Sequence, residues 1–139
     1  MSLSEARFHD LVDATQQALE DLFDPRRPPV RRITLEGARA QLTLETPAQL
    51  PYFDGHSPGH PVLPGVTQIE WAIRFARELY SLPANFVGME ALKFQHIVPP
   101  DTLLTLELEF KAEKSALTFA YRSAAGQHAS GRILLGEPT

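Results

Sequence analysis

One segment of this chain has the spacing of a long amphipathic helix, and the segments after it alternate like strands. Over residues 65–81 apolar side chains recur every three or four positions, as on one helix face. We expect a strand at residues 103–111, where Leu104, Leu106, Leu108 and Phe110 alternate with polar residues, as in a strand with one buried face. One apolar helix with one antiparallel sheet makes an α+β layer arrangement. We expect the sheet to wrap around the helix and bury both of its faces. The expected helical stripe is Val66, Ile69, Ile73, Ala76 and Tyr80, with Ala72 and Leu79 beside it.

Weaker patterns complete the expected element order. Residues 3–23 have helical spacing and end before Pro25, and residues 24–30 read as a proline-rich linker. A chain of 139 residues predicts a single domain. Within it we expect residues 1–30 to form an extra N-terminal helix with its linker, and residues 31–139 to form the main body. The other expected strands cover residues 32–36, 39–46, 86–98 with an irregularity near Leu92, 117–122 and 129–135.

Composition excludes several classes of function. The chain has no cysteine, so it has no disulfide, thiolate zinc site or cysteine nucleophile. Its net charge of -4 lacks the basic excess of nucleic-acid-binding proteins. No apolar run approaches the length of a membrane helix, and the N-terminus lacks the features of a signal peptide. The histidines and acids show no metal-ligand spacing. We expect a cytoplasmic protein without a metal, a nucleic-acid partner or a membrane partner.

A carboxylate on the expected apolar stripe is the first sign of chemistry. On a helical wheel Glu70 lies among Val66, Ile73 and Tyr80. Burying an ionised carboxylate without a partner is costly, so burial generally favours the protonated form. A carboxylic acid kept protonated near neutral pH can act as a general acid.

A histidine and a glycine that precede Glu70 in the chain could supply a base and an oxyanion donor. His56 lies in the irregular, proline-rich loop of residues 47–64, and imidazole is the side chain that most often moves protons near pH 7. Gly65 opens the helix, where unpaired N–H groups and a partial positive charge can bind a carbonyl oxygen. A base, an oxyanion donor and an acid are what removal of a proton alpha to a thioester carbonyl, with loss of a hydroxyl group, requires.

The residues around this trio resemble a known family. Residues 55–70 read GHSPGHPVLPGVTQIE. This run resembles the signature of the hotdog-fold 3-hydroxyacyl-acyl-carrier-protein dehydratases, the FabA/FabZ family. A second stretch, KFQHIVPPDTL at residues 93–103, is similar to a later strand and turn of the family. The likeness covers roughly residues 31–135. It implies an antiparallel hotdog sheet around a long central helix.

The resemblance implies roles for particular residues. His56 is the base, with its ring oriented by the Val62 carbonyl, and Glu70 assists at the departing hydroxyl. The Gly65 N–H binds the thioester oxygen. The activity implied is removal of water from a 3-hydroxyacyl thioester. Further contacts with the substrate are expected from Val62, Pro64, Val66, Phe53 and Trp71.

The resemblance also implies the partners. The substrate is carried on the phosphopantetheine of an acyl-carrier protein or of coenzyme A, and no cofactor is needed. In the family the histidine and the acid of one site come from different subunits. We therefore expect a homodimer or a larger homo-oligomer, with the acyl chain entering along the interface.

Four departures from the family pattern favour a divergent member and keep two alternatives open. Ser57 stands where the family usually has Phe, Arg74 where it commonly has Gln, and Pro100 where it has Gly, and the N-terminal helix is longer. These changes are similar to dehydratase-like proteins of aryl-polyene-type pathways. A salt bridge from Arg74 to Glu70 would weaken the acid. The alternatives are a hotdog thioesterase and a catalytically degenerate subunit that binds acyl-carrier protein. The other histidines, His9, His60, His96 and His128, are expected to be structural or surface residues.

Overall fold

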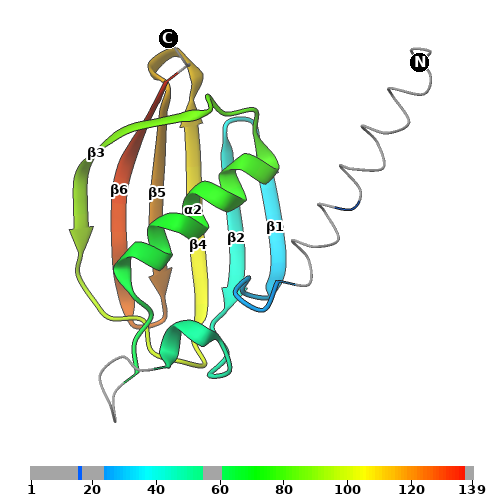
Figure 1. The fold of residues 1–139 in the computed structure, drawn as a ribbon, viewed down its shortest axis with the longest axis vertical. Coiled ribbons are helices and arrows are strands. Elements are labelled where there is room, and N and C mark those ends of the chain that lie inside the picture. The colour runs from blue at the N-terminus through cyan, green and yellow to red at the C-terminus, as the bar shows by residue number, and fades with distance from the viewer. Residues whose placement is uncertain (1–15, 17–23, 55–60, 137–139) are drawn as a thin grey trace.

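The structure is a computed structural model that describes residue 16 and residues 24–54 and 61–136. Within these residues an antiparallel sheet of six strands has the order β1-β2-β4-β5-β6-β3, and one long helix, α2, lies across one face (Figure 1). The expected one-helix, one-sheet architecture is confirmed. The elements are β1 (Val30–Glu36), β2 (Arg39–Glu45), α2 (Gly65–Leu79), β3 (Asn85–Phe94), β4 (Leu103–Lys111), β5 (Ala116–Ser123) and β6 (Gly126–Gly136), with short 3-10 helices at Pro51–Phe53 and Ala112–Lys114.

The core forms where the alternating strands meet α2. Leu42 of β2 lies opposite Leu106 of β4, and Leu44 lies opposite Leu104. All four side chains are fully buried. Each buried leucine contributes about 1.5–3 kcal/mol relative to exposure. The alternation of residues 104–110 thus buries one face of β4 as the sequence predicts, and the observed bounds of β4 coincide with the predicted ones.

Strand β3 is the irregular edge of the sheet. Its pairing with β6 shifts between Glu90 and Lys93, and Ala91 between them has a positive φ of 53°. This confirms the predicted irregularity near Leu92, because one residue leaves the ladder there. The edge carries exposed apolar side chains, namely Phe86, Val87, Met89, Leu92 and Phe94.

The predicted face of α2 is confirmed only in part: Ala72 and Ala76 are buried, and most of the other predicted residues pack at the margin of the core, but the centre of the buried face is displaced toward Trp71 and Phe75. The side chains that pack against the sheet include Trp71 and Phe75, 2% and 1% exposed, whereas Val66 is 64% exposed. The helix carries apolar residues around more than half of its circumference, and the two large aromatic rings bury the most surface. The sheet covers this one face, and Val66 and Glu70 are exposed on the other side of the helix. The buried residues of α2 are Thr67, Gln68, Trp71, Ala72, Phe75 and Ala76.

Residues just before β1 attach to the outer side of α2. Arg74 forms a 3.0 Å ion pair with Asp24, and Arg27 pairs with Glu78 and lies 4.6 Å above the Phe75 ring. The predicted N-terminal helix lies outside the described residues, apart from Gln16, which is helical. The division at residues 30 and 31 stays a prediction. In the described part of the chain, no helix has both the length and the apolarity to cross a membrane.

Candidate active site

The predicted base lies outside the described residues. The described chain stops at Asp54 and resumes at Pro61, so the positions of His56 and Ser57 relative to Val62 and Glu70 stay predictions. The other predicted residues lie in two groups. Val62, Pro64, Gly65, Val66 and Glu70 lie at or near the start of α2, and Phe53 and Trp71 lie in the core.

Gly65 begins α2 directly after Pro64, whose extended backbone (φ -59°, ψ 146°) turns the chain into the helix. The first N–H groups of a helix have no partner within it and carry a partial positive charge. Packing also requires a residue without a side chain here. A Cβ on Gly65 would lie 2.7 Å from Cζ of Phe94, at the end of β3. The helix start therefore lies against the edge strand.

Hydrogen bonds hold the segment before Gly65 in place. The Leu63 N–H donates to the Val98 carbonyl at 2.8 Å, and the side-chain amide of Gln68 donates through Nε2 to the Leu63 carbonyl at 3.3 Å. The Tyr121 hydroxyl donates to the Gln68 carbonyl at 2.6 Å. Burial raises the pKa of Tyr121 well above its usual value, so this hydroxyl stays a donor. The helix start is tied both to β5 and to the segment that follows β3.

Glu70 is exposed in the single chain, so the prediction that it is buried on an apolar stripe is wrong. It lines an open groove of about 570 Å³ on the outer side of α2, together with Ile73, Arg74, Arg77 and Glu78. The reason is the helix face: Trp71 and Phe75 point toward the sheet, and this turns Glu70 and Val66 outward. Arg74 forms ion pairs with Asp24 at 3.0 Å and with Glu78 at 3.8 Å.

Phe53 and Trp71 are core residues, 6% and 2% exposed. Trp71 packs against the edge of the Tyr52 ring, with centroids 6.0 Å apart. Next to it the sequence analysis missed Gln68, which is 3% exposed although polar. Its spacing from Trp71 and Ala72 would have revealed it if the helix face had been assigned through the tryptophan. Buried polar atoms of the described residues without a hydrogen bond include Gln68 Oε1 and Trp71 Nε1.

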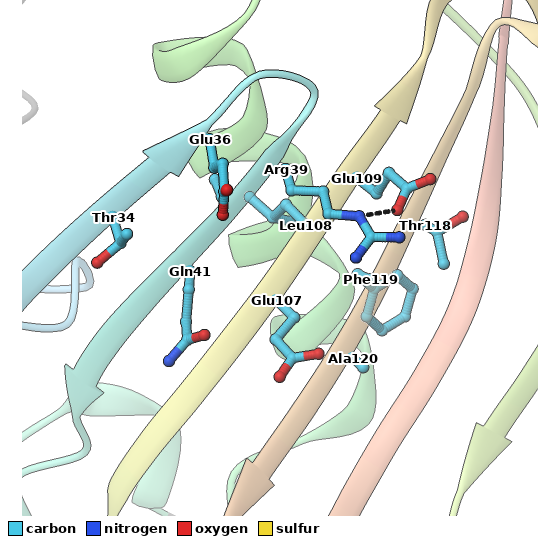
Figure 2. A pocket seen from close by; sticks show the side chains of 11 residues that line it. Thr34, Glu36, Arg39, Gln41, Glu107, Leu108, Glu109, Thr118, Phe119 and Ala120 are labelled. Carbon is cyan, nitrogen blue, oxygen red and sulfur yellow. Dashed lines mark ion pairs between the residues drawn. The ribbon is translucent and has the colours of Figure 1, made fainter.

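A hollow on the opposite face of the sheet contains no predicted site residue. It measures about 430 Å³, and its polar side chains point away from α2 (Figure 2). Arg39 and Glu109 form a 2.8 Å ion pair across it, beside Glu107 and Gln41. Such cross-strand pairs are typical of a solvated sheet face. Among the described residues, no three His, Asp or Glu side chains cluster closely enough to hold a metal ion.

Comparison with known proteins assigns the class. A family model described as ApeI-like, ApeI dehydratase, matches residues 32–132. The chain is 31% identical over 117 residues to the 3-hydroxyacyl-[acyl-carrier-protein] dehydratase FabZ of Ruminiclostridium cellulolyticum, covering 76% of this chain and 82% of that protein. It is 35% identical over 88 residues to FabZ of Natranaerobius thermophilus, covering 58% of this chain and 62% of that protein.

Solved structures agree on the fold. The dehydratase heterocomplex ApeI:P from Xenorhabdus doucetiae superposes with a TM-score of 0.72 and 30% identity, over 77% of this chain and 96% of that one. The dehydratase domain from the CurF module of curacin polyketide synthase, at 17% identity and a TM-score of 0.60, shares the fold alone; the alignment covers 83% of this chain and 45% of that one. These are hotdog-fold dehydratases. The chain belongs to the ApeI-like dehydratase family, which confirms the predicted fold and the predicted kinship with FabZ.

A short match stands apart from these. Over 24 residues the chain is 92% identical to the iron-sulfur cluster assembly protein CyaY of Ectopseudomonas mendocina. The match covers 17% of this chain and 22% of that protein, so it does not bear on the dehydratase fold.

Proposed function

We propose that this chain dehydrates 3-hydroxyacyl thioesters carried on acyl-carrier protein or coenzyme A, in the cytoplasm. The supporting observation is the arrangement at the start of α2. Gly65 opens the helix, and Glu70 stands five residues later on its uncovered side. An N–H donor and an acid are thus held on one helix, and the acid is exposed to solvent.

The proposed reaction moves two protons and one hydroxyl group. His56 removes a proton from C2, and the electron pair shifts toward the thioester oxygen, which accepts a hydrogen bond from the Gly65 N–H. The C3–O bond then breaks, and the hydroxide leaves as water with a proton from Glu70. The product is an enoyl thioester. General acid–base catalysis of this kind contributes about 10²–10⁴-fold, and an oxyanion donor contributes about 10²–10³-fold. The proposal includes no metal or cofactor, because only protons and hydroxide move.

A second hotdog chain completes the proposed site. Phe86, Met89 and Phe94 of β3 lie opposite the core residues Leu135, Ile133 and Ala129 of β6, yet all three are at least 42% exposed. Phe94, at the end of this strand, lies against Gly65 at the start of α2. An apolar edge strand with free backbone groups favours pairing with another chain. We propose a homodimer through this surface, which brings His56 of one subunit to Glu70 of the other.

The exposed position of Glu70 gives a clean test. Purified full-length protein is assayed for hydration of crotonyl thioesters, both of coenzyme A and of a phosphopantetheine carrier. Wild type should turn over, and H56A and E70Q should lose about 10²–10⁴-fold in kcat. The control is E78Q on the same helix and in the same groove, which should keep kcat within about threefold.

The same assay separates the alternatives. Release of free thiol would identify a thioesterase. Tight binding of acylated carrier without turnover would identify a carrier-binding subunit. The ion pairs of Arg74 with Asp24 and Glu78 favour an active dehydratase over the two alternatives, since these pairs join the cation to two acids other than Glu70.

A further inference from the structure

One residue of β6, His128, forms several hydrogen bonds with the segment that follows β3. This side chain is 1% exposed, and its Nδ1 lies 2.9 Å from the carbonyl oxygen of Ile97 and 3.3 Å from that of His96. Its main-chain carbonyl accepts hydrogen bonds from the N–H groups of Gln95, at 2.8 Å, and His96, at 3.3 Å. One residue thus holds three consecutive residues through both its side chain and its backbone.

The partners of the imidazole determine its tautomer. Carbonyl oxygens only accept hydrogen bonds, so Nδ1 must carry the hydrogen. In the neutral imidazole Nε2 is then the acceptor, and it lies 2.6 Å from Oγ of Ser123, which donates its hydroxyl hydrogen to it. Both ring nitrogens are satisfied in a buried site, and this leaves the ring one orientation. The hydrogen bond to Ile97 is therefore a fixed feature of the fold.

The segment that His128 holds, residues 95–97, is linked through its neighbour Val98 to the start of α2. Val98, next to Ile97, is fully buried, and its carbonyl accepts the Leu63 N–H at 2.8 Å. Leu63 is two residues before Gly65. On the other side of the segment, the ring of Phe94 packs against Gly65. A shift of residues 95–98 would move the helix start from both sides.

We propose that His128 is a positioning residue: through Ile97 and Val98 it sets the place of the Gly65 N–H. This rests on the proposed dehydratase function. An oxyanion donor acts on charge that develops in the transition state, so its placement affects kcat more than KM. A misplacement of about 1 Å can cost about 10²-fold in rate. The imidazole reaches the site only through the backbone it holds.

Three substitutions separate positioning from mere packing. H128L keeps the size of the side chain and removes the donor. H128N retains a side-chain N–H close to the position of Nδ1. S123A removes the partner of Nε2 and leaves the bond to Ile97. Crotonyl-CoA hydration gives kcat and KM, and hydrogen exchange of residues 62–65 reports the Leu63 amide. Pro64 has no N–H, so few amides share that peptide.

The expected order is specific. H128L should lower kcat by about 10–100-fold, with KM within about threefold. H128N should restore kcat to within about fivefold of wild type, and S123A should stay within about twofold. Exchange at Leu63 should be at least about tenfold faster in H128L than in H128N.

Wild-type kcat in a folded H128L protein would overturn the inference, and so would a loss that H128N fails to rescue. If H128L does not fold, H128Q replaces it, because glutamine places its donor near Nε2 and should behave as the leucine does. If wild type shows no dehydratase activity, the proposed function fails by itself. An unchanged rate of hydrogen exchange at the Leu63 amide in the variants would then refute the positioning role of His128 independently of activity.

Discussion

The ring of Phe94 lies so close to Gly65 that a Cβ added to the glycine would be 2.7 Å from the ring carbon Cζ. This contact joins the end of the edge strand β3 to the first residue of α2. It gives Gly65 a packing role beside its proposed chemical role, because any side chain there would have to displace the ring.

The variant G65A should therefore be destabilised by about 1 kcal/mol, at the low end of overpacking costs. Phe94 is 51% exposed, so its ring can move aside. Chemical denaturation of G65A, F94A and the double variant measures the coupling. The double variant should recover most of the loss caused by G65A, because F94A removes the clash. Additive losses would show that Gly65 is required for another reason.

Tyr121 anchors the first turn of α2, since its hydroxyl donates to the carbonyl of Gln68, the fourth residue of the helix. Y121F should lose about 1 kcal/mol of unfolding free energy at pH 7. Burial raises the pKa of Tyr121 well above 10.0. The stability from keeping this group neutral is complete below the unfolded-state pKa, about 10, and is lost as the pH rises above it. Urea melts between about pH 8 and 11 should show a shallower alkaline decline in Y121F. Parallel pH curves for the two proteins would contradict this account.

Strict patterns in the sequence predicted the fold well. Leu104, Leu106 and Leu108 alternate without exception, so β4 could be placed to the residue. The helix was placed to within two residues at its end, since Pro83 stops it soon after Leu79. Periodicity failed where a helix carries two apolar sides. It could not tell which side the sheet covers, and so Glu70 was predicted to be buried when it is exposed.

The candidate site was predictable in part for the same reason. Gly65 and Glu70 stand out by residue type and spacing, and both lie in the first half of α2. Gln68 and His128 are ordinary polar residues in sequence. Their roles depend on contacts between elements distant in the chain, such as His128 with Ile97 and Tyr121 with Gln68. Pairings of that kind leave no local pattern.

Asp24 links the chain before β1 to α2, and its charge can be tested alone. The hydrogen bond from the Arg26 main-chain N–H lowers the pKa of Asp24 below 3.8; partial burial opposes this, and Arg74 lowers the pKa further. A lowered folded pKa stabilises the fold above the unfolded value, and this gain disappears as the pH falls through the folded pKa. D24N keeps the acceptor for Arg26, so it should cost only about 0.5 kcal/mol at pH 7. Melts of both proteins should converge as the pH falls from about 5 toward 2. A constant difference across that range would exclude a charge effect.

Substitutions at the two edges of the sheet should affect dimer formation differently. Met89 of β3 lies opposite buried Ile133, and Leu35 of β1 lies opposite buried Ala40, so both point to the α2 face. Their exposures, 42% and 55%, are similar. Only β3 adjoins the proposed partner surface. M89K would bury an ammonium group in an apolar interface at a cost of about 2 kcal/mol or more.

Sedimentation should therefore show a dimer for wild type and L35K, and a dissociation constant at least about thirtyfold higher for M89K. Hydration of crotonyl-CoA should fall with the dimer in M89K, because each proposed site draws on two chains. At protein concentrations that restore the M89K dimer, activity should return. Full activity in a monomeric M89K protein would refute the shared site, and a loss of dimer in L35K alone would place the interface at β1.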